Sequence, residues 1–346
     1  MVRIVILLFM IQLSGSIYAK DISSSTESRL PVASQLININ DHNLHVREMG
    51  VHNPLKPDLL LLSGPTDNWH SDSAWWALGQ NFLAQEYHTI AIDRAGHAWS
   101  ETISEPSYRQ FAADLSNFIL ERDRPVILVA FASSNLSVHS LMQNADVASL
   151  VKGTVLIDPD VLTDHSIEHY SSETERYRKG WSEIEQFIND GKYDEIMQQK
   201  INEEREHLQA IISAEHEHYM DWDFYSAVET IRNTRSYQLE KFRETTHYRE
   251  DLIQAQSNPL PVDLPLVIID SDFETGYLPK IEDESVKASI IQWRDEGRDW
   301  FFQISQNSEC GAYWPIASQE HLIMMEQPEL LTRAIEKLLR CEQKKN

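Results

Sequence analysis

Short apolar runs alternate with helix-like stretches along most of this chain, and this alternation strongly limits the fold. The runs lie at residues 58–64, 87–93, 125–131, 153–158 and 266–269. Helical patterns between them include residues 73–85 and 108–121, and a last one covers 329–339. Continuous apolar runs are typical of parallel strands that are buried on both faces. The sequence therefore predicts an α/β fold, with a mainly parallel sheet flanked by helices.

A long interruption separates the fourth apolar run from the fifth. No proline occurs from Asp160 to Asn258, no glycine occurs from Lys192 to Thr275, and charged and amide side chains dominate. Apolar residues recur there at helical spacing, which predicts a helical insertion. We expect a core formed by residues 20–160 and 259–346, with residues 161–258 as a helical cap. A hairpin at residues 35–50 is predicted to precede the first buried strand.

The N-terminus has the pattern of a secretory signal. Arg3 precedes an apolar run from Ile4 to Leu13, and small residues follow up to Ala19. This run is too short for a comfortable membrane span. We expect residues 1–19 to be a signal peptide cleaved after Ala19, which predicts a secreted or periplasmic protein. An uncleaved anchor is the alternative.

The charge balance limits the classes of partner. The chain carries 54 acidic and 30 basic side chains, a formal net charge of −24. Nucleic acid and anionic membrane surfaces repel such a chain at long range, so neither is expected as a partner. A small ester- or peptide-like ligand and a protein partner both remain open.

Motifs for cofactors and metals are not found. The sequence has neither a phosphate loop nor a glycine-rich dinucleotide motif, so no cofactor is expected. The run His216-Glu217-His218 lacks the spacing that places two ligands on one helix face, and no metal site is expected. Cys310 and Cys341 could pair in an exported protein, although the sequence does not fix their separation.

Five segments, in order, resemble those of a known family. They are residues 59–64, residues 92–101 with the sequence IDRAGHAWSE, residues 125–135, residues 265–274 and residues 318–328. Together they resemble the α/β-hydrolases of the serine-esterase and peptidase kind, and the second segment is the most specific. The resemblance covers roughly residues 35–160 and 260–342. It implies a strand-to-helix turn that bears a nucleophile, followed by an acid and a histidine.

The residue at the nucleophile position is alanine. The family's turn places the nucleophile between small residues two positions away on each side. Ala130 and Ser134 are those small flanks, and Ala132 lies between them. Alanine has no heteroatom and cannot form an acyl-enzyme. The alternatives are Ser133 and Ser134, whose flanks would be bulkier.

The resemblance also assigns the other members of the site. His321 occupies the histidine position, with Glu320 where the family usually has glycine. Glu274 occupies the acid position, with Asp272 as the alternative acid and Asp158 as a further rival. An adjacent carboxylate such as Glu320 could block the site or raise the pKa of the histidine.

An oxyanion hole is implied as well. The resemblance places it at Gly64, Pro65 and the backbone of Ser133, while Ser63 replaces the family's histidine. We therefore expect a secreted, catalytically impaired pseudo-hydrolase that binds a small ligand or a partner between core and cap. One alternative is an active ester or peptide hydrolase that uses Ser133 or Ser134 with His321. The other is a non-enzymatic interaction protein that uses the cap.

Overall fold

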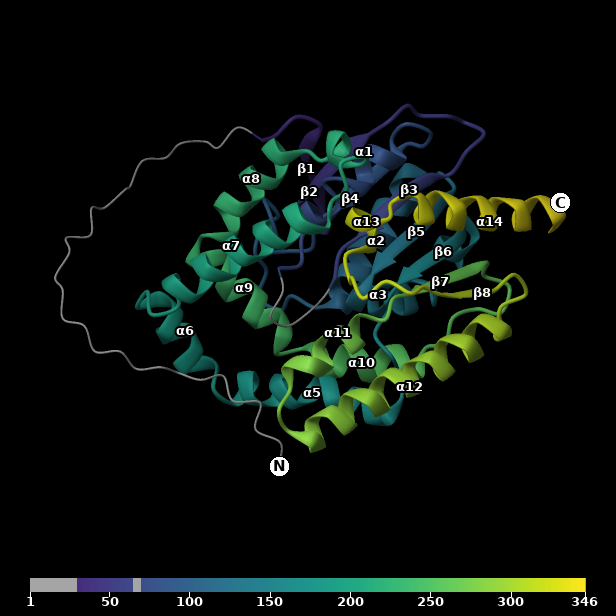
Figure 1. Cartoon of the computed structure of the whole chain (residues 1–346). Helices are drawn as coiled ribbons and strands as arrows, with labels where there is room; N and C mark the ends of the chain where they lie inside the picture. Colours follow the sequence, from purple (N-terminus) through teal and green to yellow (C-terminus); the bar gives the residue numbers. More distant parts are fainter. Residues whose placement is uncertain (1–29, 65–69, 346) are drawn as a thin grey trace.

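The computed structural model describes residues 30–64 and 70–345 of the chain (Figure 1). The predicted signal peptide, residues 1–19, lies outside the described residues. Within the described ranges, no helix is long and apolar enough to cross a membrane.

Eight strands form one sheet in the order β1-β2-β4-β3-β5-β6-β7-β8. The strands are β1 (Ser34–Ile39), β2 (His42–Met49), β3 (Asp58–Leu62), β4 (Thr89–Ile92), β5 (Val126–Phe131), β6 (Val151–Ile157), β7 (Leu266–Asp270) and β8 (Ala312–Pro315). The pairs β1–β2 and β2–β4 are antiparallel, and every other neighbouring pair is parallel. The predicted fold class is confirmed.

Helices cover both faces of the sheet, and β5 shows how its residues divide between them. Ile127, Val129 and Phe131 belong to one apolar cluster, while Val126 and Leu128 belong to the other, as the alternation of strand side chains requires. The first face is covered by the short helix η1 (Ser73–Trp76), α1 (Gly79–Leu83), α13 (Ile323–Glu326) and α14 (Glu329–Lys345). The second is covered by α2 (Tyr108–Arg122), α3 (Asn135–Leu141), α4 (Ala145–Leu150) and α12 (Glu284–Asn307).

The segment between β6 and β7 is helical and contains no strand over residues 164–257. Its helices are α5 (Asp164–Lys179), α6 (Trp181–Asn189), α7 (Asp194–Ile211), η3 (Glu217–Tyr219), α8 (Trp222–Arg232), α9 (Arg235–Thr245) and α10 (Tyr248–Ser257). Side-chain caps start several of them; Thr163 accepts from the Ser166 amide and Thr234 from the Tyr237 amide. In Figure 1, α6 to α9 lie together to one side of the sheet.

The two cysteines are joined. Cys310, just before β8, forms a disulfide with Cys341 in α14, with 6.2 Å between their Cα atoms. The bridge links the turn before the edge strand β8 to α14, the helix that packs on β6 and β7. It closes a loop with a sequence separation of 31 residues, which removes conformational entropy from the unfolded chain.

Candidate active site

The turn that follows β5 has the geometry of a nucleophile elbow. Ala132 has a φ of +48°, a conformation that side chains other than glycine rarely adopt, and α3 begins three residues later. Ala130 and Ser134 are fully buried on either side of it. Such a strained residue persists only where the surrounding packing holds it. The turn therefore has the backbone conformation of an elbow, with the methyl group of Ala132 at its positive-φ position.

Gly64 lies against this elbow. A Cβ on Gly64 would lie 2.5 Å from the carbonyl oxygen of Phe131 and 2.6 Å from the amide nitrogen of Ser133, so only glycine fits. This close approach places Gly64 next to the Ser133 amide, and the oxyanion hole itself stays a prediction. Pro65 lies outside the described residues. Proline has no N–H, so Pro65 cannot serve as an amide donor there, which corrects our assignment of that residue.

The two serines after Ala132 differ in their contacts. The hydroxyl of Ser134 donates to the carbonyls of Phe131, at 2.8 Å, and Leu62, at 3.2 Å, which directs it back toward the strands. The hydroxyl of Ser133 lies 3.2 Å from that of Tyr248, which donates to a carboxylate oxygen of Asp160. In this arrangement Ser134 stabilises the turn, and Ser133 contacts helix α10.

His321 contacts an acid at the end of β6. Its Nδ1 lies 2.8 Å from Oδ2 of Asp158. The same carboxylate accepts from the amide of Ser271 at 2.6 Å and from its hydroxyl at 2.7 Å. With Nδ1 donating to Asp158, the lone pair of the imidazole is on Nε2, the form that a general base needs.

Aromatic rings hold His321 in place. Its ring centroid lies 4.6 Å from that of Phe131, the residue before Ala132, and 4.2 Å from that of Phe273. The histidine side chain is only 10% exposed, and Ala132 is 2% exposed. The structure thus brings His321 to the elbow, in a site that is nearly closed to solvent.

The acid beside His321 is neither of the two that the resemblance favoured. Asp272 instead forms an ion pair of 2.5 Å with Arg298 and accepts from the Thr275 hydroxyl at 2.7 Å. Glu274 is buried, and that burial, together with the nearby charge of Asp158, raises its pKa to about 8. A carboxyl with this pKa is largely protonated at neutral pH. Asp158, a rival in the sequence, makes the contact because it lies one strand nearer to β5.

The raised pKa of Glu274 predicts a pH dependence. The folded chain holds this proton more tightly than the unfolded chain, so the free energy of unfolding falls as pH rises from about 4.5 to about 8. In a Glu274→Gln variant this part of the slope is lost. At pH 8 we expect the free energy of unfolding of the variant to exceed that of the wild type by roughly a few kcal/mol. Urea unfolding at pH 5 and pH 8 measures the difference.

Two comparisons complete this test. Glu282→Gln makes the same change at an exposed position and should leave the slope unchanged. Asp270, whose pKa burial raises to about 7, and Asp251, whose pKa burial raises to about 6, contribute to the slope that remains in Glu274→Gln. Equal slopes for Glu274→Gln and the wild type would contradict the assignment of the raised pKa to Glu274.

Glu320 contacts helix α7. One carboxylate oxygen lies 2.8 Å from Nε2 of His207 on α7, and the other accepts from the Leu322 amide at 2.8 Å. Burial disfavours its ionised form, but the hydrogen bonds with His207 and the Leu322 amide and the charges of the two histidines together outweigh that effect and lower its pKa. Glu320 thus links the loop that bears His321 to α7.

Buried ion pairs join helices α8 and α9 to the segments that follow β3 and β4. Arg94 lies in segment 92–101, which resembles the family most specifically. It donates to both carboxylate oxygens of Glu244 on α9, at 2.6 and 2.9 Å, and to the Ser63 carbonyl. Arg232 on α8 holds both oxygens of Asp72 at 2.9 and 2.7 Å. All four charged side chains of these two pairs are at most 3% exposed.

Further groups extend the second pair into a network. Tyr237 donates to Asp72 at 2.6 Å, and Arg232 also contacts Glu204, at 3.3 Å. Glu204 in turn lies 2.5 Å from Nδ1 of His70. This network leaves no signal in the sequence, because its members are spread over about 170 residues and share no motif.

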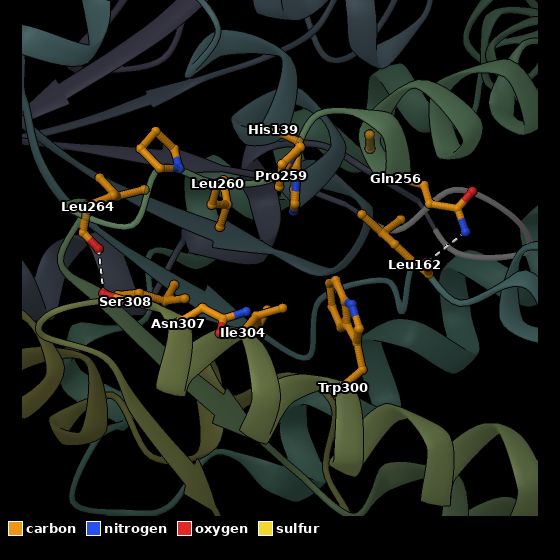
Figure 2. A pocket seen from close by; sticks show the side chains of 13 residues that line it. His139, Leu162, Gln256, Pro259, Leu260, Leu264, Trp300, Ile304, Asn307 and Ser308 are labelled. Atoms are coloured by element: carbon orange, nitrogen blue, oxygen red, sulfur yellow. Dashed lines mark hydrogen bonds between the residues drawn. The ribbon is translucent and has the colours of Figure 1, made fainter.

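A cavity of about 120 Å³ lies elsewhere, between α3, α10 and α12 (Figure 2). Neither Ala132 nor His321 lines it. Its walls are mostly apolar and include Leu162, Leu260, Leu264, Leu266, Trp300 and Ile304. Nδ1 of His139 lies 2.8 Å from the Asn258 carbonyl, and Nε2 is buried with no partner among the described residues. Burial lowers the pKa of His139 to about 4, so its ring is neutral.

Comparisons with known proteins agree with the fold. Residues 59–333 match the alpha/beta hydrolase family. The structure is similar to an epoxide hydrolase from Vigna radiata, at 13% identity and a TM-score of 0.60, over 89% of this chain and 97% of that one. It is also similar to a thermophilic esterase from Thermogutta terrifontis, at 16% identity and a TM-score of 0.51, over 89% and 98%. No curated protein matches the sequence.

The chain therefore belongs to the alpha/beta hydrolase family, as the sequence predicts. The identities to the solved structures are low enough that these likenesses establish the fold alone. The fold alone does not determine the activity.

Proposed function

We propose that this chain is a catalytically impaired member of its family, a pseudo-hydrolase that retains the scaffold without the nucleophile. One observation carries the proposal: the residue at the positive-φ position of the elbow is Ala132. Acyl transfer needs a heteroatom there, and a methyl group cannot attack a carbonyl. The pair of His321 and Asp158 remains beside it but has no hydroxyl at that position to activate.

The surroundings of the site support this proposal. Ala132 and Ser133 are almost completely buried, and the ion pairs of Arg94 and Arg232 occupy the boundary between core and cap. A hydrolase must admit an ester or amide carbonyl to the elbow. Admitting a large ester or a peptide would first require the cap to break buried charge pairs, which is costly.

The experiment that tests impaired catalysis is covalent labelling with a fluorophosphonate, which reacts only with an activated nucleophile. We expect the wild-type protein to remain unlabelled. Stoichiometric labelling that is lost in Ser133→Ala would instead favour the alternative, an active hydrolase that uses the serine after the elbow. Ser134→Ala tests the other candidate in the same way.

The ligand of such a protein fits the cavity beside His139 better than the closed elbow. Its apolar walls suit a small apolar molecule, and a cavity of roughly this size can hold one aromatic ring. With Nδ1 donating to the Asn258 carbonyl, Nε2 of the neutral ring is an acceptor. The proposed ligand is therefore a ring-sized apolar molecule with one hydroxyl. A protein partner bound through the cap is the other candidate.

A comparison of phenol with toluene, which lacks a hydroxyl, tests the role of that group. We expect saturating phenol to raise the thermal unfolding midpoint of the wild type more than toluene does, because only phenol can donate to Nε2 of His139. In His139→Leu the advantage of phenol should vanish while any effect of toluene remains. If neither compound changes the unfolding midpoint, the proposal that the ligand binds in this cavity is wrong.

The N-terminal pattern adds a location to this proposal. If residues 1–19 direct export, the protein acts outside the cytoplasm, where the disulfide between Cys310 and Cys341 can form. Mass measurement of the mature chain purified from its natural host tests this, with a new N-terminus at Lys20 as the expected result.

A further inference from the structure

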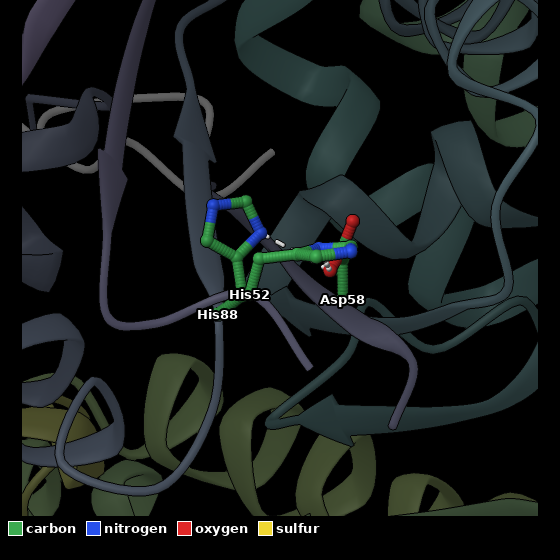
Figure 3. A group of neighbouring side chains, drawn as sticks. All are labelled: His52, Asp58 and His88. Carbon is green, nitrogen blue, oxygen red and sulfur yellow. Dashed lines mark ion pairs between the residues drawn. The ribbon is translucent and has the colours of Figure 1, made fainter. Parts of the chain in front are cut away.

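We propose that His52, Asp58 and His88 form a binding site for a divalent metal ion of the zinc class (Figure 3). Asp58 is the first residue of β3, and His88 directly precedes β4. Because β3, β4 and β5 are parallel, these residues lie at the edge of the sheet opposite to the elbow. The site is thus separate from the elbow and stands independently of the proposed pseudo-hydrolase.

The three ligand atoms are already close together. Oδ1 of Asp58 lies 3.1 Å from Nδ1 of His88 and 3.9 Å from Nδ1 of His52, and all three atoms lie within 4.8 Å of one another. Zinc bonds of about 2.0 to 2.1 Å in a tetrahedral site place ligand atoms roughly 3.3 Å apart. Only His52 has to move noticeably, and its side chain is 49% exposed.

The orientation of His88 points to a shared ion. Its Nδ1 is buried and has no hydrogen-bond partner among the described residues, although a carboxylate oxygen lies 3.1 Å away. The oxygen is therefore near the nitrogen but outside the direction of a hydrogen bond. Two ligands of one ion have this relation, because the lone pair of each is directed at the metal and not at the other ligand. A buried nitrogen without a partner is otherwise costly.

Charged neighbours contact the other nitrogen of His88 and the other oxygen of Asp58. Oε2 of Glu48 lies 3.4 Å from Nε2 of His88, where a carboxylate can hold the N–H and leave Nδ1 to bind metal. Arg124 holds Oδ2 of Asp58 at 2.9 Å and contacts Oδ1 at the longer distance of 3.3 Å. Oδ1 is thus the oxygen turned to both histidines. The charge of Arg124 weakens cation binding, and the charge of Glu48 opposes that effect, although Arg122 pairs with Glu48.

The ligand types select the ion. Two imidazoles and one carboxylate suit zinc and its neighbours, whereas calcium and magnesium prefer oxygen ligands alone. Three protein ligands leave a fourth position for water on the exposed side of His52. No other group of three histidine, cysteine or acidic side chains with this proximity occurs within residues 30–64 and 70–345.

Titration of the full-length, chelator-treated protein with zinc chloride in a calorimeter tests the site. We expect one zinc ion per chain, and an affinity at least about tenfold lower in His52→Ala and in His88→Ala. His218→Ala, which removes an exposed histidine from η3, is the matched control and should bind like the wild type. Magnesium at the same concentration should give no binding heat.

A second measurement tests the site even if His88→Ala does not fold. His52 is half exposed, so His52→Ala should keep the metal-free unfolding midpoint of the wild type. Zinc should raise the midpoint of the wild type and of His218→Ala by several degrees, but not that of His52→Ala. Zinc binding that is equal in all variants, or no zinc binding by the wild type, would overturn the proposal.

Discussion

Replacing Ala132 by serine is expected to convert an unlabelled protein into one that reacts stoichiometrically with a small fluorophosphonate. The elbow already holds the position in the required conformation, and His321 with its partner Asp158 lies beside it. A new hydroxyl would complete the division of labour among nucleophile, base and acid. We also expect hydrolysis of short activated esters to rise by about 10² to 10⁴, the range that a positioned base contributes.

The controls for Ala132→Ser follow from the same contacts. Ala132→Ser combined with His321→Ala should lose the gain, because the base is removed. Combined with Glu274→Gln it should keep the gain, because Asp158 contacts His321 and Glu274 does not occupy that place. If Ala132→Ser folds but neither labels nor hydrolyses esters, the closed cap excludes even small substrates, and the buried ion pairs become the reason for inactivity.

Replacing Arg232 by methionine is expected to have the largest effect on stability. The guanidinium is fully buried and holds both oxygens of Asp72 as well as one of Glu204. Methionine fills similar space but leaves these carboxylates without their cation. Removing one partner of a buried pair typically costs about 3 to 5 kcal/mol, and we expect a loss of this size in urea unfolding.

A double variant separates the cost of an unpaired charge from lost packing. Arg232→Met with Asp72→Asn keeps one carbonyl oxygen, which can accept from the Ala74 amide, and removes the charge stranded at Asp72; the amide NH2 replaces the oxygen that accepts from Tyr237. It should recover part of the stability that Arg232→Met loses. Arg340→Met, which breaks an exposed pair with Glu336, should change stability by less than about 1 kcal/mol. A loss in Arg232→Met as small as that would show that the network does not hold the cap.

The sheet could be predicted from the sequence because its strands carry a strong local signal. Five apolar runs correspond to β3, β4, β5, β6 and β7, and the predicted hairpin corresponds to β1 and β2. The edge strand β8 was missed. It spans only Ala312–Pro315 and is partly exposed, so it has neither the length nor the continuous apolar pattern of a buried strand. The long helix α12 was also missed, since charged residues interrupt its apolar stripe.

The candidate site could be predicted only where the backbone fixes it. Ala132 was found because the flanking small residues mark a close packing of strand and helix, and His321 because a characteristic turn follows it. The acid could not be chosen in this way. Asp158, Asp272 and Glu274 all follow strands at the same edge of the sheet, and only the folded loops decide which carboxylate reaches the histidine. The ligands His52, Asp58 and His88 were missed for a similar reason, as three separate segments supply them.

The covalent bridge has a consequence for proteolysis. His321, α13 and most of α14 lie between Cys310 and Cys341, and the turn before His321 includes the exposed residues Ala317 and Gln319. A protease that cuts this turn would not release the C-terminal helix, because the two fragments stay joined through sulfur. The nicked protein would migrate as one chain without reductant and as two with it. Electrophoresis without reductant would therefore not reveal a single cut, although such a cut would displace His321 from the elbow.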